Sequence, residues 1–264
     1  MLPRSVYSPA MQMNARPALL QRIGRLLRAK ESLVFYAIGL GLLDFAAPPA
    51  TGWLLTHRSL ATLLGTDNSV LGDAVAGRGV AVIAVALGYL TLSGFFTAGY
   101  LRSLLGRPHW GPRDARQFLR LFAFVTLSAA LSWGLGAAAR AASHHLGDPA
   151  GLVAVFALQT VVNVPLLYAG YAIVTSNVGL VRAIVASLRT FAANAFISLL
   201  VLFSLFEVLL LLWQLLPGDS GNAAALLPTV LIHVLVWGSV SFVADVVLLS
   251  VYIDSIERGT IPPT

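Results

Sequence analysis

The residues of this chain best suited to chemistry are ionisable side chains that stand inside otherwise apolar segments. There are four of them, namely Asp44, Glu207, His233 and Asp245. A charge at the centre of a membrane span costs about 2.5–3.5 kcal/mol, so each needs a partner or a function. His233 and Asp245 are twelve residues apart, which places them on nearly one helix face but about 18 Å apart along the axis. The functional interpretation is a proton or ion path; the structural one is a set of contacts between helices.

Prolines stand close to two polar positions of these segments. Pro48 and Pro49 come shortly after Asp44, and Pro165 follows Asn163 by two residues. Proline removes the hydrogen bond to the carbonyl four residues back, so a kink or break is expected. Broken helices near the midplane are typical of transporter binding sites. The candidate intramembrane polar site is therefore Asp44, Asn163, Glu207, His233 and Asp245, and the candidate helix breaks are Pro48, Pro49 and Pro165.

Polar residues near the expected cytoplasmic ends of the spans have structural interpretations. Arg189 and Asp245 both stand towards these ends and are a candidate ion pair. Ser187 and Asn194 are seven residues apart and share one helix face. We expect both to hydrogen-bond to neighbouring helices.

The catalytic and cofactor motifs that a sequence can reveal are missing. The chain contains no HExxH, GxSxG, GxxxxGK[ST] or GxGxxG motif, and it has no cysteine. His144, His145 and Asp148 are too few and too close together to predict a metal site. We expect no catalytic residue, no cofactor and no metal. An intramembrane enzyme is the weakest alternative, because it would need His233 beside a serine or carboxylate in a pocket.

The elements that must position these residues are membrane-spanning helices. Of the 264 residues, 58% are hydrophobic and 11% charged, against about 25% charged in soluble domains. Such a chain cannot bury its apolar surface in one soluble core, and it contains apolar runs near the ~20 residues that a bilayer requires. We predict an all-α polytopic bundle with six spans at residues 33–55, 79–101, 119–139, 151–174, 190–216 and 225–250.

The positions of lysine and arginine predict the orientation. With six spans and the N-terminus inside, 14 of the 17 basic residues lie on the cytoplasmic side. Only Arg58, Arg78 and Arg140 fall outside. The tyrosines Tyr100, Tyr171 and Tyr252 stand near the inner ends of their spans, where such rings favour the interface. We therefore predict three parts of the chain: a basic cytoplasmic segment at 1–32, a membrane domain at 33–250 and a cytoplasmic tail at 251–264.

The segment before the first span is amphipathic. Leu19, Leu20, Ile23, Leu26 and Leu27 recur at helical spacing, with arginines between them. We favour a helix lying in the cytoplasmic interface of the membrane. The alternative is a helix packed on a partner or on the protein's own loops.

Two parts of the sequence match in a way that suggests a parallel repeat. Residues 97–100 read TAGY and residues 168–171 read YAGY, and each is followed by a basic stretch. Similar entries into the next span then follow, LRLFA at 119–123 and LRTFA at 188–192. Parallel repeats are one building scheme of membrane transporters, and coincidence among few residue types is the alternative.

The last third of the chain carries a family resemblance. Residues 183–187 read AIVAS, Asn194 follows, and the chain closes with YIDSIERG at 252–259. Over about residues 165–260 it resembles bacterial six-span proteins of the YciC-like group, and the membrane domain attached to some glycerophosphodiester phosphodiesterases. The resemblance implies a helical bundle in the bacterial inner membrane, and it carries no catalytic residues over to this chain.

Two functions remain in competition. The first is a non-enzymatic accessory, scaffold or lipid-binding subunit of the cell inner membrane. The alternative is a small transporter or permease subunit with a polar site around Asp44 and Glu207, working with a separate ATPase subunit. The expected partners are membrane lipids, a second copy or another subunit of a membrane complex, and no nucleic acid.

Overall fold

The protein is helical throughout the part that the computed structural model describes, namely residues 9–43, 79–107, 114–146, 157–158, 160–214 and 223–259. No strand occurs within these ranges. Asp44, Pro48 and Pro49 lie outside them. The labelled helices are α1 (Pro9–Ala29), α5 (Gly79–Leu104), α6 (Ala115–Leu146), α8 (Ala169–Ser176), α9 (Leu180–Ala193), α10 (Ala195–Gln214) and α11 (Ala223–Glu257).

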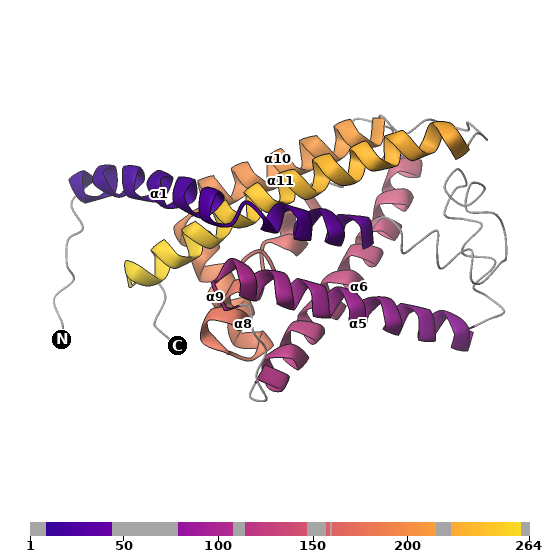
Figure 1. Ribbon diagram of the computed structural model, residues 1–264, viewed down its shortest axis with the longest axis horizontal. Coiled ribbons are helices and arrows are strands. Elements are labelled where there is room, and N and C mark those ends of the chain that lie inside the picture. Colours follow the sequence, from indigo (N-terminus) through magenta and orange to yellow (C-terminus); the bar gives the residue numbers. More distant parts are fainter. Residues whose placement is uncertain are drawn as a thin grey trace.

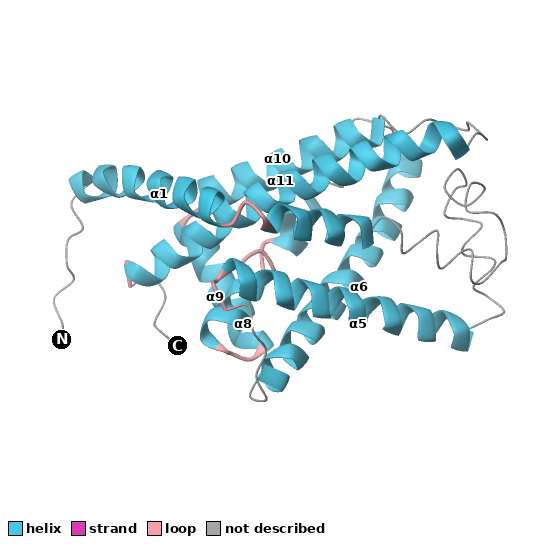
Figure 2. Ribbon diagram, viewed as in Figure 1, coloured by secondary structure: helices cyan, strands magenta, loops and turns pink. Residues whose placement is uncertain are grey.

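The long helices form an elongated bundle (Figures 1 and 2). α10 and α11 run side by side in opposite directions, and the unlabelled helix Leu33–Leu43 lies along α11. α5 packs on α6, which crosses the bundle obliquely. The short helices α8 and α9 lie near one end of the bundle, the end that also holds the last turn of α5, the first turn of α6 and the last turn of α11.

Two described helices are long and apolar enough to cross a membrane. They are Ala195–Leu212 and Pro228–Glu257. α8 and α9 together pass the same test but bend by 119° between them, so they count as a third candidate. The described residues therefore form an all-helical structure with two or three candidate membrane spans, and the count of six stays a prediction.

The core lies at the end of the bundle where α8 sits. α8 is buried along most of its length, from Ala169 to Val174. Tyr168 before it and Tyr252 on α11 are fully buried, and their rings stack with centroids 6.3 Å apart. Tyr100 and Tyr171 are also buried, each 3% exposed. The three tyrosines predicted at the membrane interface therefore contact protein instead.

The amphipathic N-terminal helix packs on the protein itself. Four of its five predicted apolar residues are half-buried against the core, and Leu20 alone is exposed. α1 contacts α11, and Arg22 Nη2 pairs with Glu257 Oε2 at 2.5 Å. This favours the alternative of a helix packed on its own chain, because α11 continues beyond the bundle far enough to cover the apolar face of α1 (Figure 1).

A glycine allows a close contact between two helices of the bundle. A Cβ built on Gly238 of α11 would lie 2.5 Å from the Cα of Ile38. Small residues at such crossings let two helix backbones approach closely, as is common in membranes. The helix Leu33–Leu43 therefore depends on Gly238 for its position on α11.

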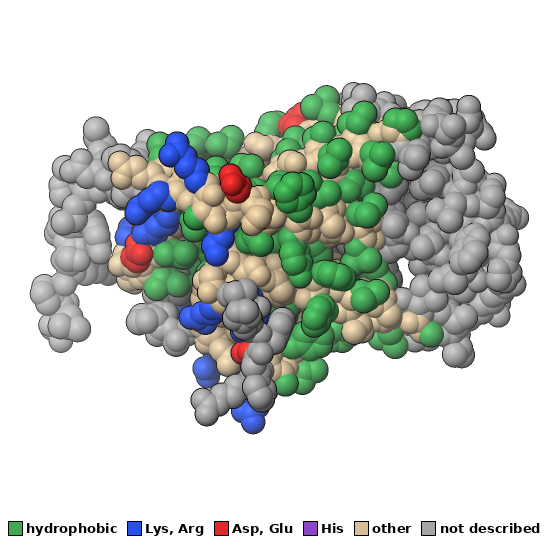
Figure 3. Space-filling model, viewed as in Figure 1, with side chains coloured by type: hydrophobic (Ala, Val, Ile, Leu, Met, Phe, Trp, Pro, Cys, Tyr) green, Lys and Arg blue, Asp and Glu red, His purple; other side chains and the backbone are tan. Residues whose placement is uncertain are grey.

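The surface separates into an apolar body and a basic end (Figure 3). Large hydrophobic side chains are exposed along the helices, among them Phe35, Phe96, Phe196, Leu211 and Leu231. Lys and Arg side chains gather where α1, α9 and the ends of α5 and α11 meet. A lipid-facing body with one positive end is the pattern expected of a membrane protein with a cytoplasmic basic side.

Candidate functional site

The Asp245 carboxyl lies among tyrosines from two other helices. Tyr171 Oη of α8 donates to Asp245 Oδ1 at 2.7 Å and also reaches the Asp245 carbonyl oxygen at 3.3 Å. Tyr100 of α5 is a second neighbour of this carboxyl, although its hydroxyl makes no hydrogen bond of good geometry. Asp245 thus ties α11 to the core, which is the structural interpretation of an intramembrane acid.

The predicted pair of Arg189 with Asp245 does not form. Arg189 is exposed on α9, and the three ion pairs of the described residues join other side chains. The prediction was wrong because it placed both residues by depth alone. The Asp245 side chain faces α8 and α5, whereas the Arg189 side chain points away from the protein.

The other predicted polar residues do not come together as one site. Glu207 is exposed on α10, so its carboxyl faces the surroundings of the bundle. His233 is half-buried in α11, three turns before Asp245. The structure describes no cluster of three or more His, Asp or Glu side chains that could hold a metal.

Asn163 lines a cavity beside a helix interruption. The backbone from Val164 to Tyr168 forms turns instead of a helix, and this stretch includes Pro165. The cavity next to it has a volume of about 370 Å³. Ser128 of α6 also lines it, with a buried hydroxyl oxygen that has no hydrogen-bond partner. The remaining lining is apolar: Phe124, Leu166, Leu167, Leu202, Leu205, Phe206, Leu209 and Trp237.

The interruption at 164–168 is held by polar side chains of the next segment. Ser187 Oγ of α9 accepts from the Tyr168 backbone N–H at 2.9 Å and donates to the Val164 carbonyl at 3.3 Å. Asn194 Nδ2 donates to Ser255 Oγ of α11 at 2.8 Å. The predicted interhelical bond of Asn194 is thereby confirmed, whereas Ser187 bonds the turns at 164–168 and not a neighbouring helix. Ser187 supplies partners for backbone groups that a broken helix leaves open.

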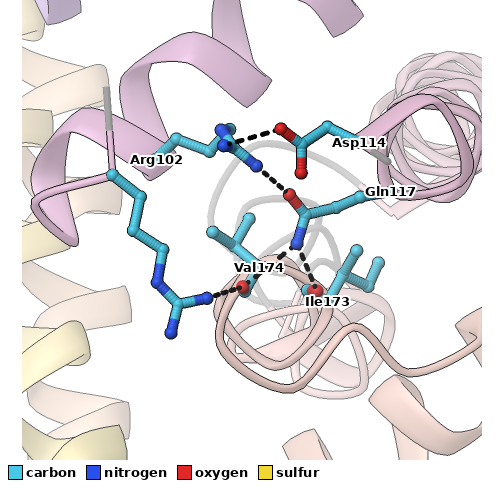
Figure 4. Close-up of polar contacts among 6 residues, drawn as sticks. Arg102, Asp114, Gln117, Ile173 and Val174 are labelled. Carbon is cyan, nitrogen blue, oxygen red and sulfur yellow. Dashed lines mark hydrogen bonds and ion pairs between the residues drawn. The ribbon is translucent and has the colours of Figure 1, made fainter. Parts of the chain in front are cut away.

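A second polar network joins α5, α6 and α8 (Figure 4). Arg102 at the end of α5 is 7% exposed; it pairs with Asp114 at 3.0 Å and donates to the Gln117 amide oxygen at 2.5 Å. Gln117 Nε2 in turn donates to the carbonyls of Ile173 and Val174 at 3.2 and 3.1 Å. These carbonyls belong to the last turn of α8, where helix carbonyls run short of backbone donors, although that of Ile173 also accepts from the Asn177 N–H. The network fixes α8 against the α5–α6 connection.

Comparison with known proteins gives no match: no protein-family model, no curated protein and no solved structure is significantly similar to this chain.

A hollow opens at the basic end, where α8 turns into α9. Its volume is about 600 Å³, and its lining runs from Ser176 to Arg182 with Arg120 of α6 opposite. Asn177 makes the turn with a left-handed backbone, φ 50°, which asparagine tolerates better than most residues. Arg120 holds this turn by donating to the Asn177 carbonyl and, at 2.9 Å, to its side-chain oxygen. The lining residues include two arginines and no carboxylate.

The sequence carried only weak signals for the Gln117 network and for this hollow. Gln117 stands in a basic stretch before a predicted span, where a polar residue is ordinary. Asn177 followed by Gly179 between two apolar segments is a turn signal. It could have located the bend, but the partner Arg120 lies 57 residues earlier.

Proposed function

We propose that the chain is a six-span integral membrane protein of a bacterial inner membrane, with both termini in the cytoplasm. We propose further that it acts as a non-enzymatic accessory or scaffold subunit that holds lipid. The observation that carries the proposal is the basic end of an otherwise apolar helical bundle (Figure 3). Charge gathered on one side sets the orientation of membrane proteins, and it favours contact with anionic headgroups.

The lengths of α5 and α6 support further spans. They have 26 and 32 residues, which at 1.5 Å per residue correspond to about 39 and 48 Å. Both exceed the ~30 Å hydrocarbon core of a bilayer. Together with α10, α11, the helix Leu33–Leu43 and the segment that ends in α8, they supply the segments for six crossings.

The use of the interior polar groups supports a structural role. Tyr171 with Asp245, Arg102 with Gln117, and Asn194 with Ser255 each join two different helices. Side chains that hydrogen-bond to each other between helices stabilise the bundle, and their polar groups are not available to a substrate. The resemblance to YciC-like proteins agrees with this role and stays a prediction.

The orientation can be tested by labelling, because the chain has no cysteine. Arg25→Cys on exposed α1 and His145→Cys near the end of α6 each introduce one thiol. A thiol reagent that cannot cross membranes should label position 145 in intact cells, and position 25 only after permeabilisation. Labelling of position 25 in intact cells would overturn the proposed topology.

The lipid-holding role can be tested on protein extracted from its native membrane. The protein should retain lipid in a fixed ratio when native mass spectrometry is performed in a neutral detergent. Protein that carries no lipid after mild extraction would overturn the proposed function.

A transporter subunit is the second candidate, and the cavity at Asn163 favours it. A broken helix, an amide and an unpartnered hydroxyl beside a space of about 370 Å³ are features of midplane binding sites. In that case Asp44→Asn and Glu207→Gln should abolish a pH-dependent flux while the protein stays folded, and a separate ATPase subunit should co-purify if transport is driven by ATP. Unchanged flux in both variants would contradict a site around these acids.

A further inference from the structure

The hollow at the α8–α9 turn presents a positive charge that the protein does not neutralise. Arg182 is exposed, and neither a hydrogen bond nor an ion pair engages its side chain within the described residues. Arg120, across the hollow, uses its guanidinium to hold Asn177. Two guanidinium groups from different helices facing one space without a carboxylate suit a phosphate, which arginine binds through paired N–H donors.

Exposed apolar side chains lie next to the same arginines. Leu119 precedes Arg120 and is 64% exposed, while Val181 precedes Arg182 and is 76% exposed. Further along α9, Val185 and Leu188 are more than 40% exposed. A free phosphate would leave these side chains uncovered, whereas acyl chains would cover them. The ligand that fits has an anionic head joined to hydrocarbon.

The place of the hollow in the fold agrees with such a ligand. It lies at the turn between α8 and α9, two short helices that bend by 119° relative to each other. The inner side of α9 is made of small residues, Ala183, Ala186, Ser187 and Thr190, all buried against the bundle. α9 thus packs on the protein through its small residues and presents its apolar and basic outer side at the basic end. Basic pockets between helices on the cytoplasmic side are known to hold anionic lipids.

We propose that the hollow lined by Arg120 and Arg182 binds the headgroup phosphate of an anionic phospholipid, whose acyl chains run over the exposed apolar side chains of α6 and α9. This rests on the proposed lipid-holding function and names its site and lipid class. Arg182 supplies the uncommitted charge, and Arg120 supplies a charge fixed in place by Asn177.

The test uses the full-length protein in neutral detergent with equal amounts of phosphatidylglycerol and phosphatidylcholine added. Native mass spectrometry counts the molecules of each lipid retained. We expect wild type to prefer phosphatidylglycerol and Arg182→Gln to lose about five-fold of this preference, the effect of about one basic residue near a lipid surface. Because no hydrogen bond or ion pair among the described residues engages Arg182, this variant should keep the wild-type melting temperature.

Arg189→Gln is the matched control. Arg189 lies seven residues further along α9 on the same face, is exposed, and does not line the hollow. Its loss should leave the lipid preference within about two-fold of wild type. Equal losses for Arg182→Gln and Arg189→Gln would overturn the site, since they would reflect surface charge alone.

Two further arms separate the remaining outcomes. Millimolar inorganic phosphate should leave the phosphatidylglycerol bound, and displacement by phosphate alone would overturn the choice of a lipid. Wild-type protein that retains lipid without preferring phosphatidylglycerol would overturn this inference while leaving the proposed function standing. Wild-type protein that retains no lipid of either kind would overturn both.

Discussion

The two connections that match in sequence, α5 to α6 and α8 to α9, begin alike and then diverge. Ala-Gly-Tyr stands near the end of α5, at 98–100, and at the start of α8, at 169–171, and all six residues are buried. Tyr100 and Tyr171 approach the same carboxyl, that of Asp245. Two matched segments thus meet α11 at one point, as a parallel repeat would predict, although the duplication itself stays a prediction.

Beyond the tyrosines, the connections are held by different chemistry. The first is fixed by charge, because Arg102 lies between Asp114 and Gln117 (Figure 4). The second contains no described ion pair: Arg120 donates to the carbonyl and side-chain oxygens of Asn177, and Ser187 completes the interrupted backbone at Val164–Tyr168 that leads into α8. α6 is one long helix, whereas α8 and α9 are separate elements that bend by 119°. The shared Ala-Gly-Tyr segment does not determine the course of the chain after it. The side chains that hydrogen-bond to each connection do.

The α5–α6 connection, which contains the ion pair of Arg102 with Asp114, should be the more sensitive of the two to loss of one side chain. Arg102→Ala leaves Asp114 and Gln117 without their buried cation, and we expect a loss of about 3 kcal/mol in unfolding free energy. The measurement is denaturant unfolding in detergent, followed by tryptophan fluorescence. Arg116→Ala, an exposed arginine on the same stretch of α6, should change stability by less than about 0.5 kcal/mol. Equal effects of the two variants would contradict the network.

Loss of Ser187, whose bonds to the backbone around α8 involve no ion pair, should lower the unfolding free energy by less. Ser187→Ala removes the acceptor of the buried Tyr168 N–H, so we expect a loss of about 2 kcal/mol. Ser239→Ala is the control, because Ser239 only donates to the Leu235 carbonyl of its own helix. If Ser187→Ala costs more than Arg102→Ala in the same unfolding assay, the proposed contrast between the connections is reversed.

Tyr100 and Tyr171 should contribute differently to stability, although they occupy matching positions in the two similar segments. Tyr171→Phe removes a 2.7 Å hydrogen bond to Asp245 and should cost about 1.5 kcal/mol. Tyr100→Phe removes a hydroxyl with no bond of good geometry and should cost clearly less. Thermal unfolding of both variants measures the difference. Equal losses would mean that the repeat positions are equivalent around Asp245.

The smallest effects should come from the left-handed residues of the two turns. The first connection uses Gly106, φ 73°, and the second uses Asn177, φ 50°. Gly106→Ala should cost about 1 kcal/mol because alanine disfavours this conformation, whereas Gly106→Asn should cost only a few tenths. Thermal unfolding distinguishes them, and an alanine variant as stable as wild type would contradict the left-handed turn.

What the sequence predicts here follows from properties that do not depend on how helices face one another. Apolar runs predict helices in lipid, the arginines predict a basic side, and Pro165 predicts a break, since proline lacks the N–H that a helix needs. The bond of Asn194 was predictable because buried polar groups at such positions require partners.

The features that the sequence did not predict depend on how each helix is rotated about its axis and on contacts between residues far apart in the chain. Arg189 and Asp245 match in depth but point in different directions, which a single sequence does not reveal. The residues of α9 were divided between a basic loop at 175–189 and the start of a span at 190, because Arg182 and Arg189 interrupt the apolar run. In the structure one helix runs from Leu180 to Ala193. The Arg120–Asn177 and Gln117–Val174 bonds each join residues 57 positions apart.

The packing of α1 on α11 has a consequence for biosynthesis. The ion pair that joins them spans 235 residues, nearly the whole chain. At about 5–20 residues per second, a ribosome needs about 10–50 s to make the intervening segment. During that time Leu19, Ile23, Leu26 and Leu27 have no helix to cover them, and the membrane surface is the nearest apolar phase. We therefore expect α1 to bind the bilayer surface until α11 has been synthesised. In a chain truncated before α11, α1 should not pack on the rest of the protein.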